Sequence, residues 1–240
     1  MINGTPFAYA DSFFAKAIER LNQESGGPIR SEVVSLGGFP APRAVKHFKK
    51  RVLSGKPDIV VLQFGSGDAA VPIQKKIDSL SSSSRKARSS IREDTSHIND
   101  DRITWRHVLK WEIKSLVGLL LRMPPVTSQE KYLEAIRQII AEAKETNTTL
   151  IVLSPFVFGS RLSALYAKRY TAALREEIAH EHDIHLLDAY TELSKFPRAT
   201  MLCHEGFHIS RRAHDVVARQ LADLITTIRT RKAAAARDIN

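Results

Sequence analysis

The sequence predicts an α/β domain with three layers, in which helices cover both faces of a parallel sheet. Short apolar runs, typical of strands buried on both faces, alternate with longer segments of helical periodicity. This alternation favours parallel strands that are joined by crossover helices. The chain has 240 residues, of which 43% are hydrophobic, and this suffices for one sizeable core. We therefore expect residues 1–240 to form a single domain.

The predicted elements follow from these patterns in chain order. Strands are expected at 31–36, 58–64, 149–153 and 184–187. The run at 58–64 is the clearest, because it is continuously apolar and so predicts burial on both faces. Helices are expected at about 9–25, 42–53, 105–121, 129–146, 162–182 and from 211 onward. We expect Ser210 to cap the last helix, and the helix at 105–121 to act as a lid.

Two segments depart from the pattern. Residues 74–104 contain a run of serines followed by basic residues, which predicts a basic, Ser-rich surface insertion. Residues 229–240 are basic and rich in alanine, which predicts a flexible tail. The net charge of +10 lies partly in these two segments, so it is weak support for an acidic partner, and we expect no nucleic-acid partner.

Composition also excludes several classes of protein. A single cysteine, Cys203, excludes an internal disulfide and a metal site made of cysteines alone. No segment has the roughly 18 uninterrupted apolar residues of a membrane span, so we expect no stable membrane insertion. Residues 1–6 have neither the basic nor the apolar region of a signal peptide. If Met1 is the true start, a cytoplasmic location is expected.

Candidate functional residues follow the predicted strands. In a parallel α/β sheet, ligands bind at the carboxyl ends of the strands. The residues expected there are Gly37-Gly38, Gly65 to Asp68, Ser154-Pro155 and Asp188. The segment 203–210, just before the last helix, is expected to reach the same edge, and it contains His204, Glu205 and His208.

Two of these segments resemble the SGNH (GDSL-type) hydrolases, a family of serine esterases and lipases. Residues 57–68 resemble the family's block in which Gly-x-Asn-Asp follows a buried strand. Residues 205–210 resemble the Asp-x-x-His block before the C-terminal helix, and His214 lies further on. By element order the resemblance covers nearly the whole chain, and it implies a flavodoxin-like sheet in three layers.

The resemblance implies hydrolysis of a small-molecule ester, an acyl or a sugar ester, without a metal or cofactor. In the family a serine attacks the ester carbonyl, and a histidine, here His208, takes its proton and later protonates the leaving alcohol. An acidic residue, here Glu205, orients the imidazole. Gly38 and Gly67 match the oxyanion-hole positions, where one hydrogen-bond donor is worth roughly 2.7–4 kcal/mol.

The sequence also departs from the family pattern. Gly67 replaces an asparagine and Glu205 an aspartate, and Gly-Asp-Ser does not occur in the chain. The family's nucleophile follows the first, central strand, and we expect that strand to be missing. The strands at 31–36 and 58–64 would then lose their shared neighbour. The pair Asp11-Ser12 is expected to cap a helix rather than to supply the nucleophile.

Two other functions stay open. One is a non-catalytic binding protein that uses the same edge for a sugar or acyl ligand. The other is a zinc metallopeptidase, because residues 204–208 match His-Glu-x-x-His, in which two histidines one helical turn apart bind zinc. That signature requires a helix, whereas Gly206 and the Ser210 cap favour a loop.

Overall fold

In the part of the chain that the structure describes, the sheet has three parallel strands. The computed structural model describes residues 8–25, 27–35, 40–72, 103–203 and 206–238, except for the side chains of 236 and 238. Within this part the strand order is β1-β2-β3, with β1 at Ile59–Gln63, β2 at Thr149–Leu153 and β3 at Ile184–Leu187. In the register, Val60 lies opposite Leu150, and Ile151 lies opposite His185.

Helices and short 3-10 turns make up the rest of the described elements. They are η1 (Tyr9–Asp11), α1 (Phe13–Ser25), α2 (Ala41–Arg51), η2 (Leu53–Gly55), α3 (Ser66–Ala69), α5 (Trp105–Leu120), α6 (Gln129–Glu145), α7 (Arg161–Ile178), α8 (Ala189–Leu193), α9 (Arg198–Met201) and α10 (Arg211–Asp238). The predicted cap of the last helix is confirmed, because Ser210 Oγ accepts a hydrogen bond from the Ala213 amide at 3.3 Å.

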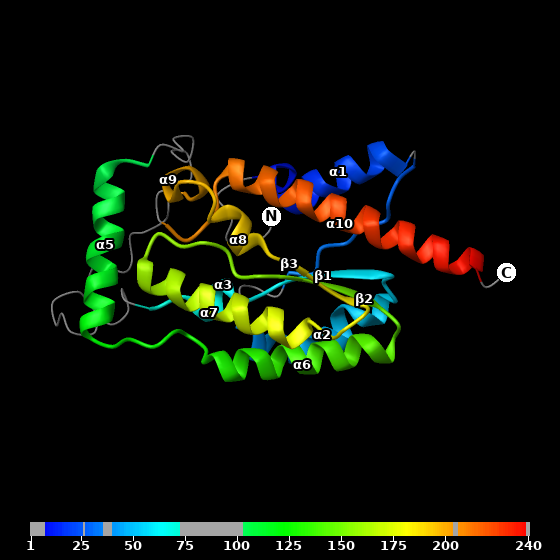
Figure 1. The fold of residues 1–240 in the computed structure, drawn as a ribbon, viewed down its shortest axis with the longest axis horizontal. Coiled ribbons are helices and arrows are strands. Elements are labelled where there is room, and N and C mark those ends of the chain that lie inside the picture. Colours follow the sequence, from blue (N-terminus) through cyan, green and yellow to red (C-terminus); the bar gives the residue numbers. More distant parts are fainter. Residues whose placement is uncertain (1–7, 26, 36–39, 73–102, 204–205, 239–240) are drawn as a thin grey trace.

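The side chains of β2 divide the core into two parts. Ile151 and Leu153 pack with residues of α1 and α10, whereas Leu150 and Val152 pack with residues of α2, α6 and α7. Figure 1 shows α1 and α10 side by side over one face of the sheet, with α6 and α7 over the other. All of β2 is buried, as a central parallel strand requires. The predicted three-layer α/β fold is therefore confirmed.

The prediction of a strand at 31–36 is wrong for the described residues 31–35. They form no strand, and residues 31–33 are exposed. A strand persists only where a neighbour takes its backbone hydrogen bonds, and within the described chain β1 pairs with β2 alone. The outer edge of β1 thus has no strand partner there. Val60 and Leu62 are buried but Ile59 and Val61 only partly, so burial of this run on both faces holds only in part.

The two unusual segments have different outcomes. Of the predicted insertion, residues 74–102 lie outside the described residues. In the predicted tail, α10 continues through residue 229 to Asp238, and the described side chains from 229 onward are exposed. The flexibility of this tail stays a prediction. None of the helices in the described ranges combines the length and the apolar character needed to cross a membrane.

Candidate active site

The turn after β1 is built around a buried carboxylate. Gly65 has φ +99°, and a Cβ there would lie 2.7 Å from Pro155 Cγ, so this turn requires glycine. Asp68 accepts hydrogen bonds from the Ala41 amide at 3.0 Å and from the Gly65 amide at 3.2 Å. Burial raises the pKa of Asp68, and hydrogen bonds from Thr127 and from the backbone oppose this rise. Asp68 therefore joins the turn to the start of α2.

Gly67 lies exposed at the carboxyl end of β1, in α3. A Cβ at Gly67 would meet no atom within 4 Å. The first side-chain atom of the asparagine that the family carries at this position would thus meet no obstacle. The other predicted oxyanion-hole residue, Gly38, lies outside the described residues, and so does Glu205.

The loops that follow the strands are tied to one another. Ser66 Oγ accepts a hydrogen bond from the Phe156 amide at 2.9 Å, which links the ends of β1 and β2. Ser154 Oγ accepts one from the Tyr190 amide at 2.8 Å, which links the ends of β2 and β3. Asp188 caps α8 through the Thr191 amide and pairs with Arg175. The carboxyl ends of the three strands therefore form one connected edge.

His208 lies in a hairpin between α9 and α10. The Cys203 amide donates to the His208 carbonyl at 2.8 Å, and Leu202 and Ile209 form an antiparallel bridge. Gly206 turns this hairpin with φ +74°. The His208 ring is half-buried and meets Phe207 edge-on, with ring centroids 5.2 Å apart. The described residues 206–208 form a loop, as the sequence predicted.

The hairpin does not meet the requirement of the zinc signature. Residues 206–208, the part of His-Glu-x-x-His that the structure describes, form a bend and not a helix. The described part of the motif is therefore not the helix on which zinc binding in that class depends. Across the described ranges no group of three or more His, Cys, Asp or Glu side chains is arranged to hold a metal ion.

Helix α5 packs directly against this hairpin through Trp111. The indole is 3% exposed. A Cβ added at Gly159 or at Gly206 would lie 2.4 Å from its ring, and the Gly159 amide donates to the Gly206 carbonyl at 2.8 Å. Trp111 is not among the candidate residues that the sequence predicts. The available signal was its spacing to Ser115 and Gly118, small residues on the same side of the helix that permit close packing.

His214 connects the start of α1 to α10. It is 4% exposed, its Nδ1 accepts a hydrogen bond from the Phe13 amide at 3.0 Å, and its ring stacks on Phe13. Ser12 Oγ accepts a hydrogen bond from the Ala15 amide at 3.2 Å, so its predicted role as a helix cap is confirmed. Burial, with Lys16 nearby, lowers the pKa of His214 to about 4.

The depressed pKa of His214 predicts a loss of stability in mild acid. The unfolded chain protonates this imidazole near pH 6.5, whereas the folded protein resists protonation until about pH 4. The neutral, buried His214 therefore contributes its full share of stability above pH 6.5. As the pH falls towards 4, the free energy of unfolding should decrease by on the order of 3 kcal/mol in total. Urea unfolding of the wild type between pH 7 and pH 4.5 should show this loss.

In His214→Asn, which retains an acceptor for the Phe13 amide, the loss should be much smaller. His180→Asn changes an exposed histidine near the end of α7 and serves as the control. Parallel pH profiles for the wild type and His214→Asn would contradict the assignment of this pH dependence to His214.

Comparison with solved structures identifies the fold. A lipolytic protein of the G-D-S-L family from Desulfitobacterium hafniense DCB-2 matches 92% of this chain over 91% of its own, with a TM-score of 0.55 and 16% identity. An acetylxylan esterase from Geobacillus stearothermophilus matches 88% of this chain over 78% of its own, with a TM-score of 0.57 and 15% identity. A lipase/acylhydrolase from Enterococcus faecalis matches 89% of this chain over 84% of its own, with a TM-score of 0.56 and 17% identity.

These matches show a three-layer α/β fold of the kind found in ester hydrolases. More particularly, it is the fold of G-D-S-L lipolytic proteins and acetylxylan esterases, so the expected resemblance to the SGNH fold is confirmed. No protein-family model matches the sequence, and no curated protein matches it either.

Proposed function

We propose that the protein is an SGNH-type hydrolase of small-molecule esters. The observation that carries this proposal is the position of His208 in the hairpin before the last helix of a chain with the fold of esterases. In the acetylxylan esterase, catalytic mutants replace a histidine and an aspartate three residues before it. Glu205 and His208 have the same spacing.

In the proposed mechanism His208 acts as the general base towards a serine hydroxyl and then as the acid towards the leaving alcohol. Glu205 orients the imidazole and stabilises its protonated form. The backbone amides of Gly38 and Gly67 stabilise the oxyanion. The exposed position of Gly67 at the end of β1 supports this role, because ligands of parallel α/β sheets bind at that edge.

The sequence contains no recognisable nucleophile. Gly-Asp-Ser does not occur in the chain, and Ser12 is buried as the cap of α1. The outer edge of β1 has no strand partner in the described residues, and the family's nucleophile follows a strand that lies at that edge. We propose that catalysis requires such a strand, ending in Gly-Asp-Ser.

The test compares the 240-residue chain with a form extended ahead of Met1 by a strand that ends in Gly-Asp-Ser. With p-nitrophenyl acetate, the 240-residue chain is expected to show background hydrolysis only, and the extended form to show turnover. His208→Ala in the extended form should lower kcat by roughly 10²–10⁴-fold, the usual contribution of a general base.

His180→Ala, a change of an exposed histidine outside the site, is the matched control and should retain activity. Turnover by the 240-residue chain that Ser12→Ala abolishes would show that the role assigned to Ser12 is wrong. An extended form that folds but stays inactive would favour the non-catalytic binding protein instead.

A further inference from the structure

Helix α5 turns its apolar face outward. Its exposed large apolar side chains recur every three or four residues and so form one stripe along the helix. The members of this α5 stripe are Trp105, Leu109, Ile113, Leu116 and Leu120, and Leu119, which is also exposed, adjoins it one turn after Leu116. Trp105 and Leu120, at the two ends, are 70% and 74% exposed. A surface helix normally places its apolar face on the core, so α5 has the opposite arrangement.

Polar contacts hold the inner face of α5 in place. Ser115 Oγ accepts a hydrogen bond from the Arg161 amide at 2.8 Å. The Glu112 carboxylate pairs with Arg161 at 2.7 Å and with Arg198 at 2.9 Å. Together with the buried Trp111, these contacts determine which side of the helix faces the body. The outward direction of the stripe therefore follows from how α5 is attached.

Cationic side chains follow one border of the α5 stripe. Arg106, Lys110 and Lys114 are spaced by four residues, so they lie in a row beside the apolar side chains. Arg106 and Lys110 are exposed and Lys114 is half-buried. Burial, and after it the neighbouring Lys110, lower the pKa of Lys114. The row places basic side chains beside the stripe, where they are complementary to anionic groups. An apolar stripe with a cationic border is the pattern of helices that lie in a lipid interface.

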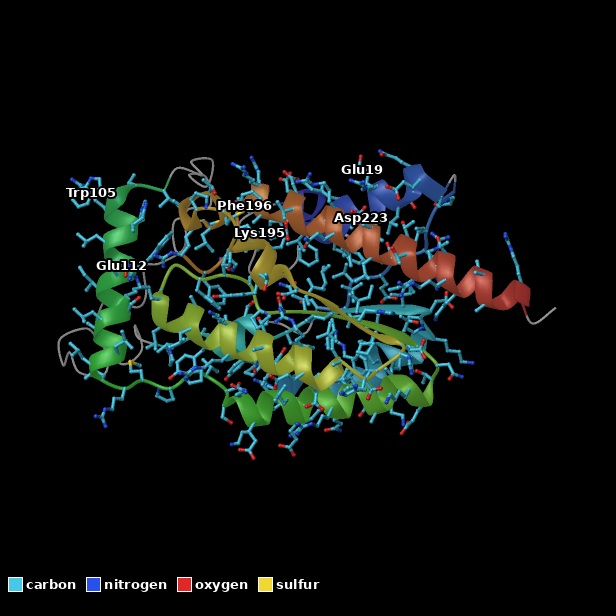
Figure 2. All side chains as sticks on the ribbon, in the orientation of Figure 1. Glu19, Trp105, Glu112, Lys195, Phe196 and Asp223 are labelled. Carbon is cyan, nitrogen blue, oxygen red and sulfur yellow. The ribbon has the colours of Figure 1, made fainter. Side chains whose placement is uncertain are left out.

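The position of α5 makes the stripe accessible to a flat surface. Figure 1 shows α5 at one end of the molecule, steeply inclined to α6, α7 and α10. Figure 2 shows Trp105 at one end of α5. The stripe extends from there to Leu120, the last residue of this outlying helix. A large exposed apolar patch of this kind marks an interaction site.

We propose that the α5 stripe docks the protein on the surface of an anionic lipid bilayer. The apolar side chains enter the boundary between headgroups and acyl chains, and Arg106, Lys110 and Lys114 contact lipid phosphates. Docking of this kind needs no membrane-spanning helix. Trp111 on the inner face of the same helix contacts Gly206, so α5 lies between the docked surface and the hairpin that carries His208.

The test measures binding of the 240-residue chain to phosphatidylcholine vesicles with and without phosphatidylglycerol. The wild type should sediment with the phosphatidylglycerol vesicles and bind the neutral ones much more weakly. The triple variant Leu109→Gln/Ile113→Gln/Leu116→Gln keeps the net charge. Its affinity for the phosphatidylglycerol vesicles should fall by about tenfold or more. The double variant Lys110→Gln/Lys114→Gln keeps the stripe, and its affinity for the phosphatidylglycerol vesicles should fall by roughly tenfold or more.

Trp105 provides a second readout. The chain has two tryptophans, and Trp111 is already buried, so a blue shift of the emission on vesicle binding reports on Trp105. Val33→Gln changes an exposed apolar residue outside α5 and should bind as the wild type does. Circular dichroism should show that every variant is folded.

Two results would overturn the proposal. Undiminished binding by the triple variant would mean that charge elsewhere in the chain is responsible. The second result would be a wild type that does not bind vesicles but forms dimers in sedimentation velocity, while the triple variant is monomeric. The stripe would then bind a second copy of the chain. Neither measurement involves ester turnover, so the outcome is independent of the proposed enzymatic function.

Discussion

Replacing Asp68 by alanine should lower the free energy of unfolding by about 3 kcal/mol. Its carboxylate is buried and accepts hydrogen bonds from the backbone amides of Ala41 and Gly65. Alanine leaves both amides without this acceptor, and each unsatisfied buried donor costs about 1–3 kcal/mol. Denaturant unfolding, followed by circular dichroism, measures the change.

Asp68→Asn separates the hydrogen bonds from the charge. Asparagine keeps one acceptor oxygen for the backbone amides. It also removes the buried negative charge, whose desolvation raises the pKa of Asp68. The free energy of unfolding should therefore fall clearly less with asparagine than with alanine. Asp58→Ala, at an exposed carboxylate just before β1, is the control and should change stability by less than about 0.5 kcal/mol. If Asp68→Ala were as stable as Asp58→Ala, the turn would not depend on this carboxylate.

Replacing Gly206 by alanine should also lower the free energy of unfolding by about 3 kcal/mol. Two effects add: φ is +74°, where a Cβ costs about 1–2 kcal/mol, and the new Cβ would lie 2.4 Å from Trp111 Nε1. Forcing an extra carbon into such packing costs about 1–3 kcal/mol. The midpoint of urea unfolding should therefore fall.

Gly55→Ala is the matched control, because a Cβ at Gly55 would meet nothing within 4 Å. A double-mutant cycle with Trp111→Leu isolates the steric part: if the indole causes the clash, Gly206→Ala should cost at least about 1 kcal/mol less in the Trp111→Leu background. Equal costs in both backgrounds would attribute the whole effect to the backbone of Gly206.

Most elements could be predicted because their causes are local. The apolar runs at β1, β2 and β3 are short and bounded by turn residues, and the helical periods of α6 and α7 repeat over several turns. The loop around His208 was also predictable, because Gly206 has the conformational freedom for a left-handed turn and Ser210 favours a helix start.

The strand predicted at 31–36 shows the limit of local patterns. Its residues have the composition of a strand, but a strand needs a neighbour to accept and donate its backbone hydrogen bonds. Whether such a neighbour is present depends on a distant segment. The described residues 31–35 accordingly form no strand, although their side chains favour one.

The order of strands and helices and the loop that contains His208 follow from the amino-acid sequence, because these features depend on neighbours a few residues away. Three features depend on tertiary structure: the hydrogen bond from the Phe13 amide to His214 across 201 positions, the close contact of Trp111 with Gly206, and the outward direction of the α5 stripe. Each arises from packing between segments that are distant in the chain, and periodicity along one helix does not reveal which of its faces meets the body.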